Sequence, residues 1–431
     1  MARKMKDSGI EWIGEIPEGW EIRKIKNNFM IYAGATPKSE KAEYWDGGLP
    51  WITPADFKTT DKYVSYGRKS LTALGYDSCG STLVPAGSII FSKRAPVGSV
   101  VIAKNTLCTN QGCLACIPND AVNSTYFYYC MSIFTEQFEL VSAGTTFKEI
   151  AASTFASFLL PCPPLSQQNE IVNFLDKESS RIDSMLSKTR SSIEEYKKLK
   201  QAVITQAVTK GVRGEREMKD SGNPWFGQIP TDWKLSRVGL HFSIILGKML
   251  CNAPLNDTYT LEPYYCAADV HFDGVADGER KKMWFSPIEK DLYRVSVGDL
   301  LVVEGGAGAG GSAIVENQDS YTYIQNSIMI VRSKGNTDNR YLRYLLEFLV
   351  KQGYIDIVCN KATIPHFTKD KLSGVPFCLC PTGEQEEIAD YLDAKCAEID
   401  GLIAKKEQLV KELESYKKSL IYEVVTGKRE V

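Results

Sequence analysis

MKDSGIEWIGEIPEGW occupies Met5 to Trp20, and nearly the same line returns as MKDSGNPWFGQIPTDW at Met218 to Trp233. Ten of the sixteen positions are identical at a constant offset of 213 residues. Solenoid repeats run to only about 20–50 residues, so a period this long indicates a duplicated domain. The same segment therefore enters each half of the chain, and we expect an internal repeat with pseudo-two-fold symmetry.

A second pair of similar segments closes each half. PLSQQNEIVNFLDKESSRID (Pro164 to Asp183) returns as PTGEQEEIADYLDAKCAEID (Pro381 to Asp400) at an offset of 217. From each start onward, apolar side chains recur at three- and four-residue steps, with Glu, Lys, Gln and Ser between them. This pattern predicts two helices of roughly 40 residues, hence about 60 Å each. A narrow apolar stripe of that length needs a helical partner, so we expect the helices to pack antiparallel as a coiled coil.

The remaining sequence predicts two mixed α/β modules. Short apolar runs bounded by turn residues predict strands at Gly87–Arg94, Val97–Asn105, Val297–Gly306, Ser312–Asn317 and Tyr323–Ser333. One amphipathic helix is predicted in each module, at Ser124–Val141 and Asn339–Ile357. The expected fold class is therefore α+β, with two mixed α/β domains separated by two long antiparallel coiled-coil helices. The expected bounds are 1–160 for the first module, 161–212 for the first spacer helix, 213–376 for the second module, and 377–431 for the second spacer helix and tail.

The two ends of the chain also fit together. VTGKREV follows the second helix, and VTKGVRGEREMKDSG follows the first. The end of the chain thus matches the segment that precedes an MKDSG motif, and the chain begins MARKMKDSG. We expect the two termini to be neighbours.

Composition excludes several classes of protein. The net charge of −2 and pI of about 6.1 give no global basic field, although nucleic-acid binding needs only a local basic face. No apolar segment follows the first charges, and no apolar run approaches the ~18–20 residues of a membrane span, so we expect a cytoplasmic protein without a membrane partner. Cys113-Leu-Ala-Cys116 has a metal-ligand spacing, but the second half has no equivalent pair. The twelve cysteines are better interpreted as small apolar side chains, and we predict no metal and no cofactor.

Stretches that are similar to catalytic motifs lack their required context. Gly306-x-Gly308-x-x-Gly311 is followed by SAIVEN, a predicted strand, whereas a dinucleotide site needs a helix there; we expect a glycine-rich hairpin turn. Asn223-Pro224-Trp225-Phe226 lacks the second proline of the N-P-P-[FY] motif of amino-methyltransferases. All three histidines lie in the second module, so duplicated histidine chemistry is impossible. We predict no catalytic residues.

The layout resembles the specificity subunit of Type I restriction-modification systems. The resembling elements are the entry K-D-S-G-x-x-W-x-G-x-I-P-x-x-W (twice), Thr36 to Phe57, SAGTTFKEI (Ser142 to Ile150), and the helix start P-x-x-x-Q-x-E-I-x-x-[FY]-L-D (twice). The resemblance implies two target-recognition domains, each of which reads one half of a split double-stranded DNA site. It implies helices that dock two adenine methyltransferase subunits, a restriction-translocation subunit that can join, and no catalysis by the chain itself.

On this resemblance, polar, amide and basic side chains on loops are expected to contact DNA, because such groups read base edges and position phosphates. In the first module we expect Thr36, Lys38, Lys93, Arg94, Asn110, Gln111, Thr145, Thr146 and Lys148. In the second we expect Lys248, Asp269, His271, Gln325, Asn326, Lys361, Thr363 and His366. Each could instead cap a turn or lie in solvent. Two other functions stay open: a methyltransferase or nuclease that acts alone, and a two-headed coiled-coil scaffold that does not bind DNA.

Overall fold

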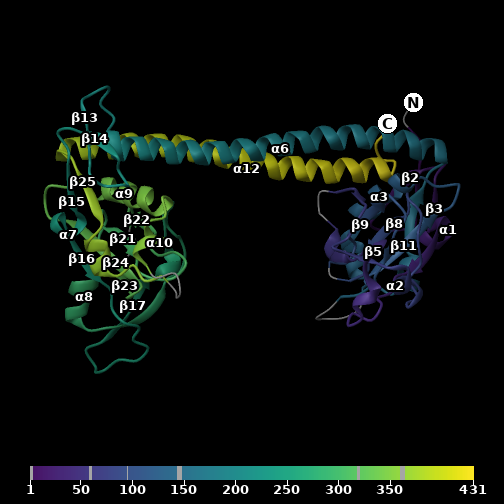
Figure 1. The fold of residues 1–431 in the computed structure, drawn as a ribbon, viewed down its shortest axis with the longest axis horizontal. Helices are drawn as coiled ribbons and strands as arrows, with labels where there is room; N and C mark the ends of the chain where they lie inside the picture. Colours follow the sequence, from purple (N-terminus) through teal and green to yellow (C-terminus); the bar gives the residue numbers. More distant parts are fainter. Residues whose placement is uncertain (1–2, 58–60, 95, 143–147, 318–320, 360–364) are drawn as a thin grey trace. The chain divides into compact units, whose positions relative to one another are not determined.

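The computed structural model describes residues 3–57, 61–94, 96–142, 148–317, 321–359 and 365–431. The chain forms two compact units (Figure 1). Unit 1 comprises Met1–Arg190 with Gln408–Val431, and unit 2 comprises Ser191–Glu407. The two long helices α6 (Leu165–Lys210) and α12 (Thr382–Val425) are therefore each divided between the units. Each unit holds one mixed α/β module and one half of each long helix.

Unit 1 begins with a hairpin, β1 (Met5–Asp7) and β2 (Glu15–Pro17), and contains two larger sheets. The first has the strand order β4-β11-β8-β9-β6, the second has β10-β5-β7, and β3 pairs with β12. The strands are β3 (Glu21–Lys24), β4 (Phe29–Ala33), β5 (Trp45–Ile52), β6 (Tyr63–Val64), β7 (Lys69–Leu71), β8 (Ile89–Ser92), β9 (Val100–Ala103), β10 (Cys108–Thr109), β11 (Cys113–Pro118) and β12 (Leu159–Cys162). The helices are α1 (Ile25–Asn28), η1 (Ala42–Tyr44), η2 (Pro54–Asp56), α2 (Ala73–Asp77), α3 (Ser124–Ile133), α4 (Thr135–Leu140) and α5 (Ala152–Ser157).

Unit 2 repeats this plan. The hairpin is β13 (Met218–Asp220) with β14 (Gln228–Pro230), the larger sheets have the orders β16-β24-β21-β22 and β20-β17-β23, β15 pairs with β25, and β18 with β19. The strands are β15 (Lys234–Arg237), β16 (Phe242–Leu246), β17 (Thr260–Tyr265), β18 (Val270–His271), β19 (Gly274–Val275), β20 (Lys281–Phe285), β21 (Leu300–Val303), β22 (Ser312–Ile314), β23 (Tyr323–Ile324), β24 (Ile328–Ser333) and β25 (Pro376–Leu379). The helices are α7 (Val238–His241), η3 (Ala267–Asp269), α8 (Pro287–Tyr293), α9 (Asn339–Lys351), α10 (Tyr354–Val358) and α11 (Lys369–Ser373).

The predicted helix of each module is in fact two helices. In unit 1, α3 ends and α4 begins at Phe134, whose backbone leaves the helical region (φ −96°, ψ 24°). In unit 2, Gly353 takes a left-handed conformation (φ +88°) between α9 and α10. Glycine adopts this conformation without the steric penalty of a Cβ, so the break in unit 2 follows directly from the residue type. The prediction of a glycine-rich hairpin is confirmed, because β21 and β22 on either side of Gly306 and Gly308 pair antiparallel.

Cys113 and Cys116 both lie in β11, three residues apart. Side chains in a strand alternate between its faces, so these two thiols point to opposite sides of the sheet. Cys116 packs in the core with Phe91 and Leu114, and Cys113 packs in a separate core on the other side. Burial raises the pKa of both thiols. They are core side chains, as the sequence indicated, and they do not converge on one point.

The repeated entry segment has the same role in both units. Met5 pairs with Pro17 in the β1–β2 hairpin, and Met218 pairs with Pro230 in the β13–β14 hairpin, in the same register. Each hairpin leads to a tryptophan that is fully buried, Trp20 or Trp233. The final Trp of the motif is thus the anchor of the entry segment.

In unit 1 this tryptophan binds the start of α6. The Trp20 indole Nε1 and the Arg3 guanidinium Nη2 both donate to Gln167 Oε1, each at 2.8 Å. Arg3 also lies over the indole ring, 5.3 Å from its centroid. We call this trio the unit 1 clasp, and it joins the entry hairpin to the first turn of the long helix.

Unit 2 contains the same arrangement at the start of α12. Trp233 Nε1 donates to Glu384 Oε2 at 3.2 Å, and Arg216 both pairs with the Glu384 carboxylate and lies over the indole ring at 5.2 Å. This trio is the unit 2 clasp. It differs from that of unit 1 in its acceptor, a fully buried carboxylate where unit 1 has an amide, and in a second cation, Arg213, whose Nη1 lies 3.8 Å from Glu384 Oε2.

The Gln and Asp side chains of the helix-start motif contact the module that packs on the helix. In unit 1 the Gln168 amide accepts from the backbone N–H of Asn123 (2.8 Å), the residue that caps α3, and donates to the Pro163 carbonyl (2.8 Å). Asp176 accepts from the Tyr129 hydroxyl at 2.6 Å. In unit 2 the corresponding contacts are Gln385 with Asp338 and Cys380, and Tyr344 with Asp393 (2.7 Å). These side chains fix each module to its long helix.

Within each unit the two half-helices run side by side in opposite directions. In unit 1, Asp183 of α6 pairs with Lys417 of α12 at 2.6 Å, and Arg190 pairs with Glu414 at 2.5 Å. In unit 2 the pairs are Tyr196 with Lys406 and Lys200 with Asp400. Exposed ion pairs contribute only about 0–1 kcal/mol each. The buried apolar stripe, at about 1.5–3 kcal/mol for each fully buried side chain, contributes far more.

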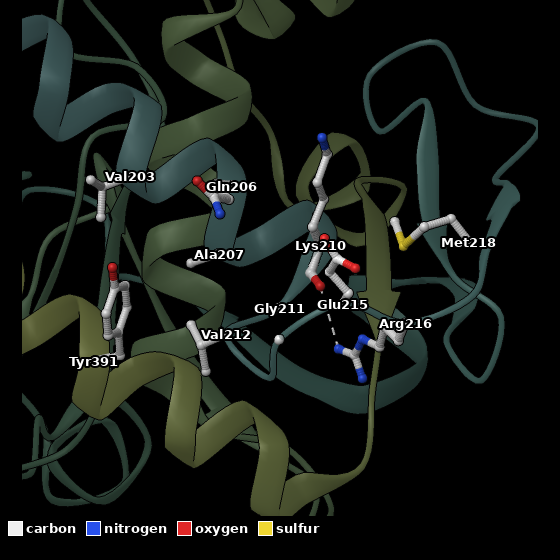
Figure 2. A pocket seen from close by; sticks show the side chains of 11 residues that line it. Val203, Gln206, Ala207, Lys210, Gly211, Val212, Glu215, Arg216, Met218 and Tyr391 are labelled. Atoms are coloured by element: carbon white, nitrogen blue, oxygen red, sulfur yellow. Dashed lines mark hydrogen bonds between the residues drawn. The ribbon is translucent and has the colours of Figure 1, made fainter.

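Both ends of the chain lie in unit 1. Arg3 and Val431 line one cavity of about 260 Å³ beside the unit 1 clasp, and Figure 1 shows the N and C labels close together. The expectation that the termini are neighbours is confirmed. In unit 2 the equivalent place holds the connection from α6 to β13, which turns at Gly211 (φ +76°). Figure 2 shows the cavity of about 650 Å³ that this connection lines, with Arg216 donating to the Lys210 carbonyl at 3.4 Å.

Candidate nucleic-acid interface

In unit 1 two loops cross at the end of the sheets. A Cβ on Gly34, just after β4, would overlap the carbonyl oxygens of Thr109 and Asn110, so the crossing requires glycine. Beyond it, the exposed Thr36 hydroxyl donates to the Gln111 side-chain oxygen. Three of the predicted residues, Thr36, Asn110 and Gln111, are therefore brought together although they come from distant parts of the sequence.

Lys93 and Arg94 follow β8 and lie at the same edge. The backbone N–H of Lys93 donates to the Gly112 carbonyl at 2.9 Å, which places it beside the crossed loops. Both cations bind Glu149: Lys93 Nζ is 2.9 Å from Oε1, and Arg94 Nε is 2.9 Å from Oε2. The hydrogen bond from Lys93, aided by that from Arg94, lowers the pKa of Glu149. Two cations share one carboxylate, so the cluster keeps one positive charge.

The other predicted residues of unit 1 are less closely grouped. Lys38 is exposed, and its carbonyl accepts from the Trp45 indole at 3.4 Å. Lys148 is exposed, with its ammonium 3.7 Å from Glu139. Thr145 and Thr146 lie outside the described residues.

Unit 2 has the same crossing of loops. A Cβ on Gly247, just after β16, would overlap the Gln325 carbonyl, and the Asn326 N–H donates to the Lys248 carbonyl at 2.8 Å. Gln325 and Asn326 follow β23 as Asn110 and Gln111 follow β10, and both of these short strands pair in parallel with the strand beside them. The two amide pairs therefore occupy equivalent positions.

Lys248 belongs to this crossing through its backbone, but its ammonium is occupied. The side chain is buried, Nζ lies 2.5 Å from Glu289 Oε2, and the rings of Tyr259 and Phe285 lie within 4.9 and 5.3 Å. Because the charge is already neutralised inside unit 2, the side chain is not presented at the surface in this conformation.

Asp269 stabilises a turn. It accepts from the backbone N–H of Cys266 at 2.7 Å and from Arg280 at 3.1 Å. In unit 1, Asp56 accepts from Thr53 and Arg68 in the equivalent turn, at 2.9 and 3.0 Å. The carboxylate that we selected from the sequence thus has a structural task common to both modules.

His271 lines a cavity together with residues of the long helix α6. Its Nε2 lies 3.0 Å from the Ala268 carbonyl, and the residue lines a cavity of about 670 Å³. The same cavity is lined by Lys197 and Lys200 of α6 and by Lys351 of α9, all within unit 2. The lining therefore places His271 beside α6 and α9.

His366 lies at the edge of the crossed loops, opposite a residue that we did not predict. Its Nδ1 is 3.5 Å from Glu304 Oε2, at the end of β21. The signal for Glu304 was present in the sequence, because Gly87-Ser-Ile-Ile-Phe-Ser-Lys93 aligns with Gly298-Asp-Leu-Leu-Val-Val-Glu304. Lys361 and Thr363 lie outside the described residues.

Two further observations concern the described ranges of the chain. There, no three His, Cys, Asp or Glu side chains are grouped in a way that could hold a metal ion. Nor does any helix in these ranges have both the length and the apolar character of a membrane span.

The fold defines a protein with two structurally equivalent modules, each with a polar edge at which two loops cross. The family model described as the Type I restriction modification DNA specificity domain matches twice, over residues 17–195 and 231–412. The chain belongs to this family.

Individual relatives agree with this assignment. The Type I restriction enzyme MjaIX specificity subunit of Methanocaldococcus jannaschii is 32% identical over 250 residues, which cover 57% of this chain and 56% of that relative, so the match spans about half of its length. The MjaVIII specificity subunit of the same organism is 22% identical, with 96% of this chain and 93% of the relative covered.

Solved structures have the same fold. A chain from a study of complex assembly and conformational transition in the type I R-M system matches with a TM-score of 0.75 at 16% identity, covering 96% of this chain and 99% of the other. The HsdS subunit from Thermoanaerobacter tengcongensis matches with a TM-score of 0.56 at 16% identity, covering 96% and 98%. At such identities the likeness shows the fold alone.

Proposed function

We propose that this chain is the DNA-recognition subunit of a Type I restriction-modification complex and has no catalytic activity of its own. Each module reads one half of a bipartite double-stranded DNA site. The observation that carries the proposal is the repeated family match over two modules that present the same crossed-loop edge. Two such readers on one chain allow it to read the two different halves of a bipartite target.

The chemistry of the edges supports recognition of base pairs. In the major groove, an amide side chain can form two hydrogen bonds with one adenine, and Arg or Lys can form two with one guanine. Asn110 and Gln111 in unit 1, and Gln325 and Asn326 in unit 2, occupy equivalent positions beside the crossed loops. We assign these amides to base recognition, with Lys93, Arg94 and the exposed Lys38 and Lys148 contributing guanine or phosphate contacts. We also keep Thr145, Thr146, Lys361 and Thr363 as proposed contacts.

We infer that α6 and α12 together form an antiparallel coiled coil that sets the length of the unread gap between the half-sites. The opposed ion pairs within each unit and the continuous 46- and 44-residue helices support this. By analogy with the relatives, two methyltransferase subunits dock on this frame in the cytoplasm, and a restriction-translocation subunit completes the nuclease. Inserting four residues into both helices should lengthen the gap while leaving both half-sites unchanged.

The test is methylome sequencing in a host free of adenine methylation. One strain carries this chain with the methyltransferase subunit encoded beside it, and the control carries the methyltransferase alone. Methylation at one split motif, present only with this chain, is the expected result. Methylation by the purified chain alone would establish the catalytic alternative. If this chain and the methyltransferase subunit are both soluble and associate but methylate no motif, the result favours the scaffold that does not bind DNA.

A further inference from the structure

The two modules carry opposite charges at one equivalent position of their crossed-loop edges. In unit 1 the residue after β8 is Lys93, whose ammonium binds Glu149. In unit 2 the residue after β21 is Glu304, whose carboxylate lies against His366. The cation and its acidic partner in unit 1 are thus replaced by an acid and a histidine in unit 2.

Backbone hydrogen bonds establish the first half of this equivalence. Lys93 N–H donates to the Gly112 carbonyl at 2.9 Å, and Glu304 N–H donates to the Ser327 carbonyl at 2.8 Å. Gly112 and Ser327 each lie in the loop that follows the amide pair. Both residues therefore leave their strand at the same place on the edge.

The partner residues are equivalent as well. The backbone carbonyl of Lys93 accepts from the backbone N–H of Ile150 at 3.0 Å. The backbone carbonyl of Glu304 accepts from that of Phe367 at 2.6 Å. Isolated bridges join the next residues along, Arg94 with Glu149 and Gly305 with His366. The position of Glu149 in unit 1 is consequently that of His366 in unit 2.

The electrostatic consequence is a reversal of sign. In unit 1 the cluster of Lys93, Arg94 and Glu149 keeps one positive charge. In unit 2, Gly305 stands where Arg94 does and has no side chain, so this position supplies no cation. Lys371 is nearby, but its ammonium donates to the His366 carbonyl at 2.7 Å and to Cys359 at 3.7 Å. A carboxylate, that of Glu304, thus stands in unit 2 where unit 1 has the Lys93 ammonium.

The charge restricts what Glu304 can bind. A carboxylate is repelled by phosphates, so at a DNA-facing edge it favours hydrogen-bond donors on the bases. In the major groove these donors are the exocyclic amino groups of cytosine N4 and adenine N6, and carboxylates characteristically accept from cytosine N4. The Glu304 side chain is 17% exposed and that of His366 beside it is 62% exposed, so the pair lies at the surface.

We propose that Glu304 reads an exocyclic base amino group in the half-site of unit 2, whereas the equivalent Lys93 of unit 1 serves an acceptor-rich guanine edge or a phosphate. This inference rests on the proposed function. It assigns the two modules opposite hydrogen-bonding polarity at one shared position of a common frame.

The experiment repeats the methylome measurement with Glu304→Ala, with the isosteric Glu304→Gln, and with Lys93→Gln as the matched variant in unit 1. Glu304→Ala should make one position of one half-site degenerate, with the preference for the correct base falling about 5- to 150-fold. Glu304→Gln should shift a cytosine position toward adenine, because glutamine pairs with adenine, and should leave an adenine position unchanged. Lys93→Gln should affect the other half-site.

The outcomes separate the two levels of inference. A wild-type chain without a motif of its own would refute the proposed function. A wild-type motif that both Glu304 variants leave unchanged would refute the role of Glu304 alone. Glu304→Gln preserves shape and size, so loss of methylation of the whole motif by this variant, with no base position made degenerate and an unchanged melting temperature, would also overturn it.

Discussion

The clasp of unit 2 offers a direct test of how each entry segment is held to its long helix. The Glu384 carboxylate is fully buried and receives the Trp233 indole and the Arg216 guanidinium, whose own side chain is 18% exposed. Glu384→Ala removes both carboxylate oxygens at once. It leaves the buried Trp233 indole N–H and the largely buried Arg216 guanidinium without this acceptor. Breaking a buried pair in this way costs about 3–5 kcal/mol.

Glu384→Gln should be far milder, because unit 1 already performs the same task with an amide. There Gln167 accepts from both Trp20 and Arg3 at 2.8 Å. The exchange of a charged for a neutral acceptor costs about 1 kcal/mol, the difference between hydrogen bonds to charged and to neutral groups.

Thermal unfolding measures both variants, monitored by calorimetry so that transitions of the two units can be separated. For a unit of this size, 1 kcal/mol shifts the melting temperature by roughly 2–4 °C. We therefore expect a fall of about 6–20 °C for Glu384→Ala and about 2–4 °C for Glu384→Gln in the transition of unit 2. Equal shifts for the two variants would show that packing, not hydrogen bonding, holds the clasp, and the reasoning would be wrong.

Three further predictions follow from the described contacts. Tyr344→Phe removes the 2.7 Å hydrogen bond to Asp393 and should destabilise unit 2 by about 1–3 kcal/mol in the same calorimetric assay, since the carboxylate is an ionised acceptor. Gly34→Ala places a Cβ against two carbonyl oxygens, so it should abolish recognition of one half-site in the methylome while the other half-site is retained. Burial raises the pKa of Cys108 to about 11, so this thiol should resist alkylation of the native chain at pH 8 and react after denaturation, as mass spectrometry of the labelled peptides would show.

Much of the frame was predictable because its residues repeat at fixed offsets. The two entry motifs, the two helix starts and the two buried tryptophans recur in order along the chain, and each recurrence corresponds to the same contact in both units. The periodicity of a long helix is likewise a local property, visible without knowledge of its partner. The break at Phe134 was missed, because no glycine or proline marks it in the sequence.

The polar edges were predictable only in part. Asn110, Gln111, Gln325 and Asn326 were all selected from the sequence, and the structure places the two amide pairs at equivalent positions after β10 and β23. Lys248, in contrast, has the residue type of a surface contact, and only its neighbours in space reveal that Glu289 already binds its ammonium.

The sequence by itself determined the duplication, the two long helices and the anchors that fix each module to them, because these depend on residue type and spacing along the chain. The tertiary structure alone decided which charges meet at the edges. More than fifty residues of sequence separate Lys93 from Glu149, and likewise Glu304 from His366. Backbone pairing of a strand end with a distant loop brings the two side chains of each pair together. The spacing of residues along the chain does not predict that pairing.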